Sequence, residues 1–282
     1  EVASGSPSGT VSTPSLRIGE HATKNGGDCS QVGTWVETTL GPEGGTCTLT
    51  ADIQITDFDL SQGSGYGIMS MSSRVTLDGA GHTITGPGWT NGQPYTVGVS
   101  VKSSGHTMVV KDLTIENFAF GLRSYNANGL TITGVTVENV GSVGMYINGV
   151  DSLLLENNIV NDSGMQVFGY NSSIGVGDGT CTGTGQYVSG AEWANAPIVI
   201  KNNQVTDGLY TSDGAGWCID GNTVISGSLS VSYAWDQVSP QNHIIKNNQI
   251  IGHTTGSGFI IVGSGNTFDS NTASGNKIGF NF

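Results

Sequence analysis

Three polar side chains recur at nearly equal spacing and could act together on an anionic substrate. Lys102, Arg123 and Tyr146 stand 21 and 23 residues apart, in the similar segments VSVKSS, FGLRSYN and VGMYING. Alternate side chains of a strand point to opposite sides. If the apolar residue before each of the three points inward, they point outward and form a ladder on strands about 4.8 Å apart. Adjacent cations repel each other, so the ladder favours a bound polyanion over a purely structural role.

This ladder has the groups that β-elimination of a uronate chain requires. One group neutralises the carboxylate, a base removes the adjacent proton, and an acid protonates the leaving oxygen. Lys, Arg and Tyr fill such roles where neighbouring groups tune their protonation. Exposed aromatic rings also suit stacking on sugars. The side chains that we expect to bind substrate are Tyr125, Asn148, Gln166, Tyr170, Tyr187, Trp193 and Tyr210.

A group of aspartates supports a different reaction. Asp213, Asp220 and Asp236 could supply the two carboxyl groups of a glycoside hydrolase, which lie about 5 to 9.5 Å apart. Asp beside Gly is also a common turn, and TSDG and CIDG both have this pair. The hydrolase is therefore the alternative hypothesis, and the lyase is preferred.

Two glutamates are candidates for holding a cation. The segments TIEN and TVEN place Glu116 and Glu138 at the same position of successive repeats. Stacked carboxylates repel unless one is protonated or a cation bridges them. The sequence thus offers a candidate Ca²⁺ or Mg²⁺ site, with two solvated carboxylates as the simpler alternative.

The elements that position these residues repeat along the chain. VVKDLTIEN, TITGVTVEN and LLLENNIVN begin 22 residues apart, and VIKNNQVTD and IIKNNQIIG follow at about twice that spacing. Short apolar runs separated by Gly, Asn and Ser turns indicate strands. A period near 22 predicts a solenoid whose repeats stack on one another, a parallel β-helix. Asparagines recur at one corner, where they can hydrogen-bond along the stack and tolerate a left-handed backbone.

Two other folds fit the repeat less well. A leucine-rich horseshoe needs a strict leucine pattern, which is missing. A β-sandwich has no reason to repeat.

These segments, together with TLDGAGHTITG upstream, resemble right-handed parallel β-helix proteins of the pectate-lyase-like and NosD-like superfamily, over roughly residues 47–282. The resemblance implies an all-β, right-handed solenoid. The superfamily includes lyases, hydrolases, epimerases and modules without activity. Some alginate lyases of this fold place a Lys base and an Arg acid on neighbouring coils, and Lys102 and Arg123 look like that arrangement, with Tyr146 as an alternative base. TSDG is only faintly similar to NTDG of the polygalacturonases, whose other motifs are missing.

The chain divides into a lead and one domain. Residues 1–28, rich in Ser, Gly, Thr and Pro, predict a flexible lead and N-terminal cap. Residues 29–282 form a single β-helix domain, interrupted by a long insertion at 168–197. Long loops on solenoids usually build the binding face.

The four cysteines form two local pairs. Cys29 with Cys47 and Cys181 with Cys218 predict disulfides in an oxidising compartment. No CxxC spacing is present, so a structural zinc site is not expected.

Composition limits the partners. The net charge of −13 argues against nucleic acid, and no run of 18 apolar residues predicts a membrane span. The first residue is Glu, which suggests a mature secreted protein. We expect a secreted monomer that acts on an acidic polysaccharide. A carbohydrate-binding module without activity is a further alternative.

Overall fold

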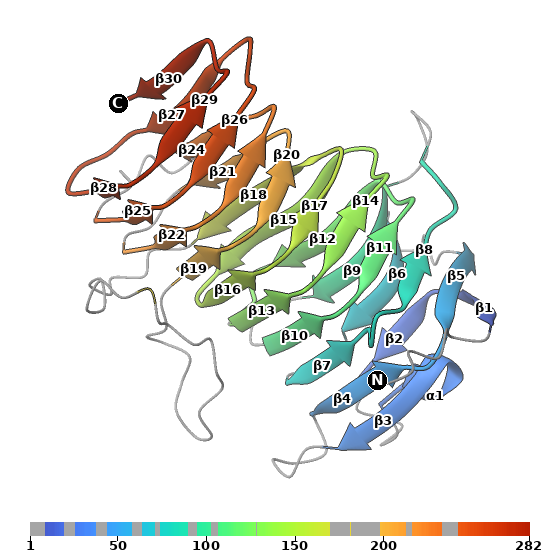
Figure 1. Cartoon of the computed structure of the whole chain (residues 1–282). Coiled ribbons are helices and arrows are strands. Elements are labelled where there is room, and N and C mark those ends of the chain that lie inside the picture. Colours follow the sequence, from blue (N-terminus) through green and yellow to red (C-terminus); the bar gives the residue numbers. More distant parts are fainter. Residues whose placement is uncertain are drawn as a thin grey trace, which may run out of the picture.

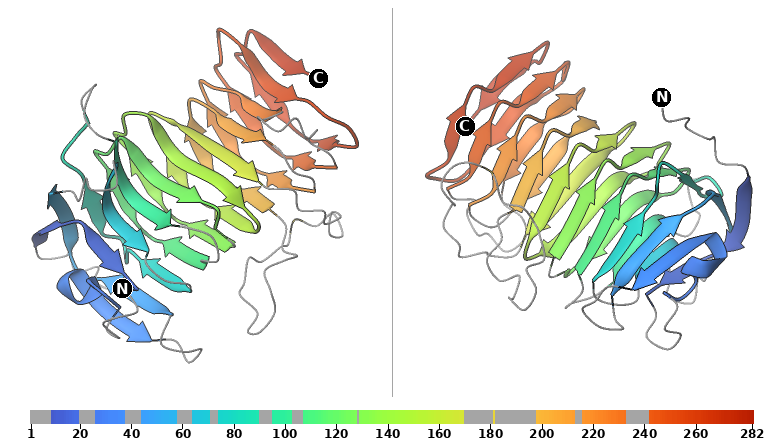
Figure 2. Two further views of the ribbon diagram at one scale, coloured as in Figure 1. Left: turned by 180° about the vertical axis from the view of Figure 1, so that it is seen from behind. Right: turned by 60° about the horizontal axis from the view of Figure 1, so that its bottom comes forward.

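A computed structural model shows three parallel sheets that coil into a right-handed β-helix (Figure 1). The N-terminal and C-terminal coils lie at opposite ends of the solenoid (Figure 2). The structure describes residues 9–19, 26–37, 44–57, 64–70, 74–89, 95–102, 107–127, 129–169, 181, 198–212, 216–232 and 242–282.

Each sheet has ten strands, and each complete coil contributes one strand to each sheet. Sheet A contains β1 (Thr10–Pro14), β5 (Asp52–Asp57), β8 (Thr83–Thr85), β11 (Thr114–Glu116), β14 (Thr136–Glu138), β17 (Ile159–Val160), β20 (Gln204–Thr206), β23 (Thr223–Ile225), β26 (Gln249–Ile251) and β29 (Thr272–Ser274). Sheet B contains β2 (Leu16–Ile18), β6 (Ser64–Ser70), β9 (Tyr95–Lys102), β12 (Phe120–Tyr125), β15 (Val143–Val150), β18 (Gly164–Gly169), β21 (Leu209–Ser212), β24 (Leu229–Ser232), β27 (Ser257–Ile261) and β30 (Ile278–Asn281). Sheet C contains β3 (Gly33–Glu37), β4 (Gly45–Leu49), β7 (Val75–Asp78), β10 (Thr107–Lys111), β13 (Gly129–Thr133), β16 (Leu153–Glu156), β19 (Ile198–Lys201), β22 (Cys218–Asp220), β25 (Ile244–Lys246) and β28 (Thr267–Asp269).

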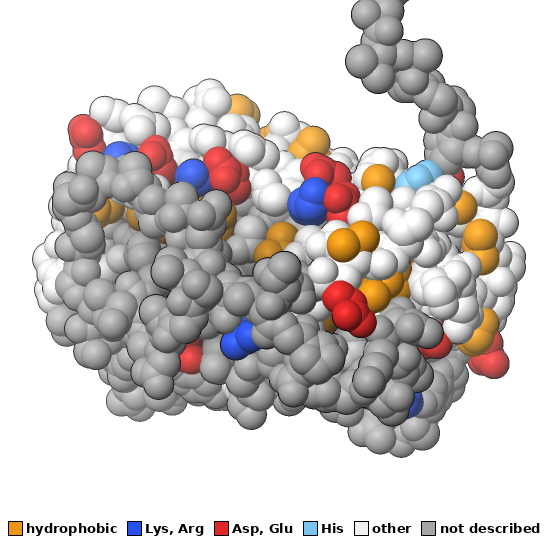
Figure 3. All heavy atoms as spheres, turned by 90° about the horizontal axis from the view of Figure 1, so that it is seen from below, with side chains coloured by type: hydrophobic (Ala, Val, Ile, Leu, Met, Phe, Trp, Pro, Cys, Tyr) orange, Lys and Arg blue, Asp and Glu red, His pale blue; other side chains and the backbone are white. Residues whose placement is uncertain are grey.

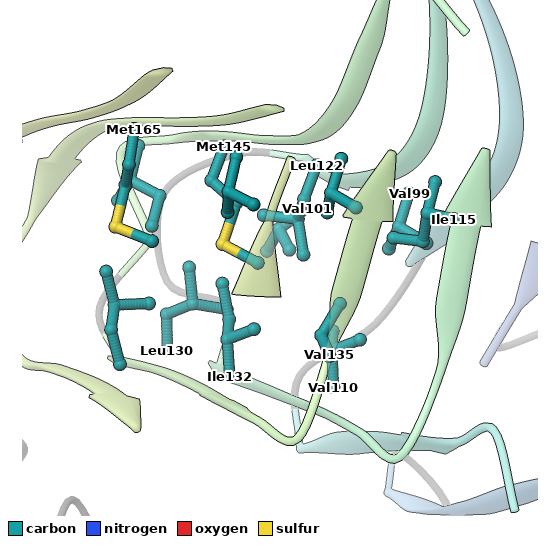
Figure 4. Close-up of a cluster of buried hydrophobic side chains, with 14 of the residues drawn as sticks. Val99, Val101, Val110, Ile115, Leu122, Leu130, Ile132, Val135, Met145 and Met165 are labelled. Carbon is teal, nitrogen blue, oxygen red and sulfur yellow. The ribbon is translucent and has the colours of Figure 1, made fainter. Parts of the chain in front are cut away.

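The core is the interior of the coil, and the inward-facing apolar side chains of all three sheets fill it. Along β12, Leu122 and Ser124 are buried while Arg123 between them is partly exposed. Leu122 is in register with Met145 of the next coil. Figure 4 shows both side chains pointing into the interior, toward valines and isoleucines of the other sheets. The two-residue alternation of the sequence therefore separates core from surface.

Asparagines form the predicted ladder at the corner between sheets C and A. The Asn203 Nδ2 atom donates to the carbonyl oxygen of Leu155 at 3.0 Å and to the Asn222 side-chain oxygen at 2.9 Å. The same contacts repeat through the buried or partly buried side chains of Asn158, Asn203, Asn222, Asn248 and Asn271. The residue before each of them has a positive φ, as at Asn202 (φ 55°). Each corner thus has one residue in the left-handed region and one that hydrogen-bonds to the next coil.

Charges of opposite sign alternate along a row of sheet C, with the uncharged Thr133 between Lys111 and Glu156. The last residues of its strands are in register from Asp78 to Asp269. Ion pairs join neighbouring coils in this row, which is visible in Figure 3. The pairs are Lys111–Asp78 at 2.6 Å, Lys201–Glu156 at 3.1 Å and Lys246–Asp220 at 3.6 Å. A shift of one strand along its neighbour would separate these ion pairs, so the row favours the observed register.

The N-terminal end is closed by a short helix and an antiparallel strand. Helix α1 (Cys29–Val32) precedes β3, which pairs antiparallel to β4. The predicted Cys29–Cys47 disulfide joins α1 to β4, with Cα atoms 5.8 Å apart. The β-helix begins earlier than residue 29, because β1 and β2 already pair with β5 and β6. The described part of the lead, from residue 9 onward, is therefore the first coil.

Candidate functional site

A pocket of about 340 Å³ lies on the outer face of sheet B. Its lining comes from three successive strands, β9, β12 and β15. The lining residues are Tyr95, Phe120, Arg123, Tyr125 and Tyr146. Four of the five are aromatic, and the fifth is a cation. This combination can hold a sugar ring against its rings and an anionic group against its charge.

Arg123 is the centre of this pocket. Its guanidinium lies over the ring of Tyr125 at 4.5 Å and near the Phe120 ring at 5.3 Å. The Nε atom donates to the Tyr125 hydroxyl oxygen at 2.8 Å, and Nη2 donates to the same oxygen. Among the described residues, the guanidinium forms no ion pair with a carboxylate, unlike the three lysines of sheet C. Its charge therefore remains available to an incoming anion.

Tyr146 occupies the next coil, directly beside Arg123. The two Cα atoms are register partners, and the guanidinium lies 5.9 Å from the Tyr146 ring. The Asn148 Nδ2 atom donates to the Tyr146 hydroxyl oxygen at 3.3 Å. Tyr125 and Tyr146 have ring centroids 5.6 Å apart. Two phenol groups thus border one cation, each held by a different donor.

Glycine allows the strands of sheet B to approach sheet A closely beneath the pocket. A side chain at Gly121 would overlap Val137 and the carbonyl oxygen of Gly144. Gly121 lies between Phe120 and Leu122 on β12. The close packing it permits fixes the strand that carries Arg123 and Tyr125.

The expected ladder of Lys102, Arg123 and Tyr146 is wrong in its first member. Arg123 and Tyr146 are adjacent rungs, but the register partner of Arg123 on β9 is Ser100. Lys102 is the partner of Tyr125, in the neighbouring column. The column repeats every 23 residues here, whereas Lys102 and Arg123 are only 21 apart. The side chain of Lys102 lies outside the described part of the structure.

The columns beyond Arg123 follow the prediction. Gln166 is the register partner of Tyr146, and Asn148 is the partner of Tyr125. Tyr210 is the partner of Gln166, two coils from Tyr146, and its hydroxyl donates to the Asp207 carbonyl oxygen at 3.3 Å. The predicted binding residues Tyr170, Tyr187 and Trp193 lie outside the described residues.

The described aspartate of the alternative site has a structural environment. Asp220 accepts from the Asn247 Nδ2 atom at 2.8 Å and pairs with Lys246 on the sheet C row. Asp213 and Asp236 lie outside the described residues. Asp220 is thus engaged on a different sheet from the aromatic pocket.

The two glutamates are adjacent rungs of sheet A, as predicted. Glu116 and Glu138 are register partners, and Glu116 Oε1 accepts from the Thr85 hydroxyl at 2.8 Å. They are therefore not part of the pocket on sheet B.

Within the described residues, the one cluster of three metal-ligating side chains is Cys181, Cys218 and Asp220. Its cysteines form the second predicted disulfide, which leaves no thiolates for a metal.

Sequence reasoning missed three aromatic residues of this face. Tyr95 and Phe120 line the pocket, and Phe168 lies 5.6 Å from Tyr146 between ring centroids. Phe120 precedes a glycine and Tyr95 begins its strand, so neither fits a simple inward-outward alternation. Phe168 could have been predicted from its spacing, because it follows Tyr125 and Asn148 in the same column of sheet B.

A family model described as right handed beta helix region matches residues 44–206, which is 163 of the 282 residues. This family includes polysaccharide-degrading enzymes, and membership indicates a protein that acts on or binds carbohydrate. Comparison with curated proteins and with solved structures found no match in either.

In the described part of the chain, no helix has the length and apolar character to cross a membrane. The two disulfides indicate an oxidising, extracellular environment.

Proposed function

The chain belongs to the right-handed β-helix region family, and from this premise we propose that it is a secreted polysaccharide lyase. It cleaves a uronate-containing acidic polysaccharide by β-elimination on the outer face of sheet B. The observation that carries the proposal is the contact of the Arg123 guanidinium with the Tyr125 hydroxyl, with Tyr146 beside both.

Arg123 neutralises the uronate carboxylate. Two of its five N–H groups point to Tyr125, and the others are free to donate to a carboxylate. Removal of the proton beside a carboxylate places negative charge on that group, and a fixed cation stabilises it. A local cation also attracts an acidic polymer to a protein whose net charge is −13.

The two tyrosines divide the proton transfers. The Tyr125 oxygen accepts two hydrogen bonds from the Arg123 guanidinium, which hold it beside the bound carboxylate, and we assign to it the removal of the proton. The Tyr146 oxygen accepts from the Asn148 side-chain amide, and we assign to its O–H group the protonation of the leaving oxygen. Asn148 positions Tyr146 for that step. Lys102, the register partner of Tyr125, is proposed as a further cation beside the substrate.

Other residues extend the binding surface. The rings of Tyr95, Phe120 and Phe168 provide stacking surfaces along the coil axis. Gln166 and Tyr210 continue the Arg123 column over two further coils. A polymer has several contact points there, which orient one sugar over Arg123.

Arg123→Gln tests the proposal, and Lys201→Gln is the control because it removes the same charge from another sheet. Lysis of the acidic polymer, measured as ultraviolet absorbance of the unsaturated product, should fall about a hundred-fold or more, because a preorganised donor to developing charge is lost. Lys201→Gln removes one positive charge from sheet C, outside the pocket, and should retain wild-type activity. Equal effects of the two substitutions would show that only net charge matters and would contradict the role of Arg123.

A further inference from the structure

An asparagine–glycine pair on sheet B lies beside the aromatic pocket, and its chemistry bears on the lifetime of the site. We propose that Asn148 is a site of spontaneous deamidation, and that the aspartate formed there inactivates the pocket. The modification depends only on the local chain, whereas its effect on catalysis rests on the proposed function.

The pair lies at an irregularity in β15. Asn148 is the register partner of Phe168 on β18, and the next residue of β15 with a partner on β18 is Val150. Gly149 is therefore skipped, and its φ is 68°. A residue in excess of the partner strand and a glycine in the left-handed region are the features of a β-bulge.

This local structure favours ring closure at Asn148. Deamidation begins when the backbone nitrogen of the following residue reaches the Cγ atom of the asparagine. A regular strand holds these two atoms apart, and a side chain on the following residue obstructs their approach. Gly149 has no side chain, and the bulge interrupts the regular strand geometry next to it.

The Asn148 side chain is also weakly held. It is partly exposed, so water reaches its amide. Among the described residues, its one hydrogen bond is the contact of Nδ2 with the Tyr146 hydroxyl oxygen at 3.3 Å. The ladder asparagine Asn158 differs in each respect, because it is fully buried, makes several hydrogen bonds and precedes Ile159.

The reaction balances with water as the other reactant. The Gly149 nitrogen forms a bond to the Asn148 Cγ atom, and the side-chain nitrogen leaves as ammonia with the proton that the Gly149 nitrogen loses. Water then adds to one of the two carbonyl groups of the cyclic imide. The ring opens to aspartate or to isoaspartate, and no oxidation or reduction takes place.

The new carboxylate changes the pocket in two ways. It replaces the donor to the Tyr146 oxygen with an acceptor, so the Tyr146 O–H group donates to the carboxylate instead of to the leaving oxygen. It also adds a negative charge beside Tyr125, the register partner of Asn148 and the hydrogen-bond partner of Arg123. That charge compensates Arg123 and repels an anionic substrate.

The chemical step is tested by ageing the protein in mildly alkaline buffer at physiological temperature. Peptide mass mapping locates deamidated asparagines, and enzymatic methylation identifies isoaspartate. A synthetic peptide of residues 145–151 is aged in parallel and sets the time scale. We expect Asn148 to convert in the folded protein while Asn158 stays intact. If Asn148 is as intact as Asn158 once the peptide has fully converted, the proposal is wrong.

The effect on activity is tested with Asn148→Asp, which makes the product directly. On the acidic polymer that the wild-type protein cleaves, kcat/KM should fall about ten-fold or more, because the charge that stabilises the developing anion is compensated. Wild-type kcat/KM in this variant would refute inactivation and leave the lyase proposal in place. If no polymer yields unsaturated product, the lyase proposal and the inactivation fail together, and the mass map still decides the modification.

Asn148→Gln separates this site from other sources of ageing. Its amide closes the corresponding ring far more slowly, and each protein is compared with its own fresh sample. Asn25, Asn91 and Asn128 also precede glycine and age in both proteins. The wild-type protein should lose activity with time, and the variant should keep its starting level. Equal losses in the two proteins would place the inactivation elsewhere and overturn the role of Asn148.

Discussion

At the scale of single residues, the environment of a cation decides its use. Lys201 forms an ion pair with Glu156 of the neighbouring coil, and this pair favours the register of the two strands. Arg123 has aromatic rings and a phenol oxygen as neighbours. Aromatic faces attract a cation and leave its charge uncompensated by a carboxylate, so Arg123 can still bind an anion.

His243 makes the stability of the fold depend on pH. Its Nδ1 atom accepts from the backbone N–H of Trp217 at 3.1 Å, and burial lowers its pKa from 6.5 to about 4. The unfolded chain binds a proton near pH 6.5, before the folded chain does. Stability is therefore fully present above pH 6.5 and declines as the pH falls toward 4. We expect a loss of about 3 kcal/mol in the free energy of unfolding across this window.

The measurement is urea unfolding between pH 7.5 and 4, with His243→Asn as the comparison. The Asn side-chain oxygen can accept from Trp217 without titrating, as Asn266 Oδ1 does from the His243 backbone N–H at 3.0 Å in the same corner. The variant should lose much of the pH dependence in this range. An unchanged slope in the variant would show that another group is responsible.

At the scale of elements, the asparagine ladder joins the coils where sheets C and A meet. Asn203 satisfies the Leu155 carbonyl oxygen and the Asn158 backbone N–H, both buried. Asn203→Ala leaves these groups without partners and should lower the free energy of unfolding by about 3 to 5 kcal/mol. Urea unfolding at pH 7 of the wild-type protein and the variant measures this change in the free energy of unfolding.

Asn202 is the matched control for that substitution. It is exposed and has a φ of 55°, a conformation that glycine adopts without strain. Asn202→Gly should change the unfolding free energy by less than about 1 kcal/mol. If the two substitutions cost the same, the ladder has no special role in stability.

The sequence was informative wherever a feature repeats with the coil. The parallel β-helix and the asparagine corner follow from the period, because stacking forces equivalent residues into columns. Both disulfides follow from the even number and local pairing of the cysteines. The register of one column was harder to predict. Coils in this chain differ in length, so a spacing of 21 residues predicts that Lys102 occupies the column in which the structure places Ser100.

The aromatic part of the site illustrates the same limit. Phe120 and Tyr95 belong to the pocket through contacts between strands, with ring centroids 5.7 Å apart. Their positions in the sequence have no periodic relation to Arg123. The hydrogen bond from Arg123 to Tyr125 also depends on side-chain orientation, which spacing alone does not determine.

At the scale of the whole molecule, the three faces of the solenoid have different properties. Sheet C has the row of alternating charges, sheet A has the stacked glutamates, and sheet B has the aromatic pocket with Arg123. A rigid solenoid separates these surfaces, and so a polymer can lie along one face without disturbing the ion pairs of another. We propose that the face of sheet B breaks an acidic polysaccharide by elimination.

The most direct measurement is parallel recording of ultraviolet absorbance and reducing ends during incubation with acidic and neutral polysaccharides, with and without a chelator. We predict a rise in absorbance on an acidic polymer that matches the new reducing ends one for one, and none on neutral glucans. We also expect the rise to persist with chelator, because Arg123 supplies the neutralising charge. Reducing ends without absorbance would indicate hydrolysis and contradict elimination. The absence of both signals on every acidic polymer would contradict it equally.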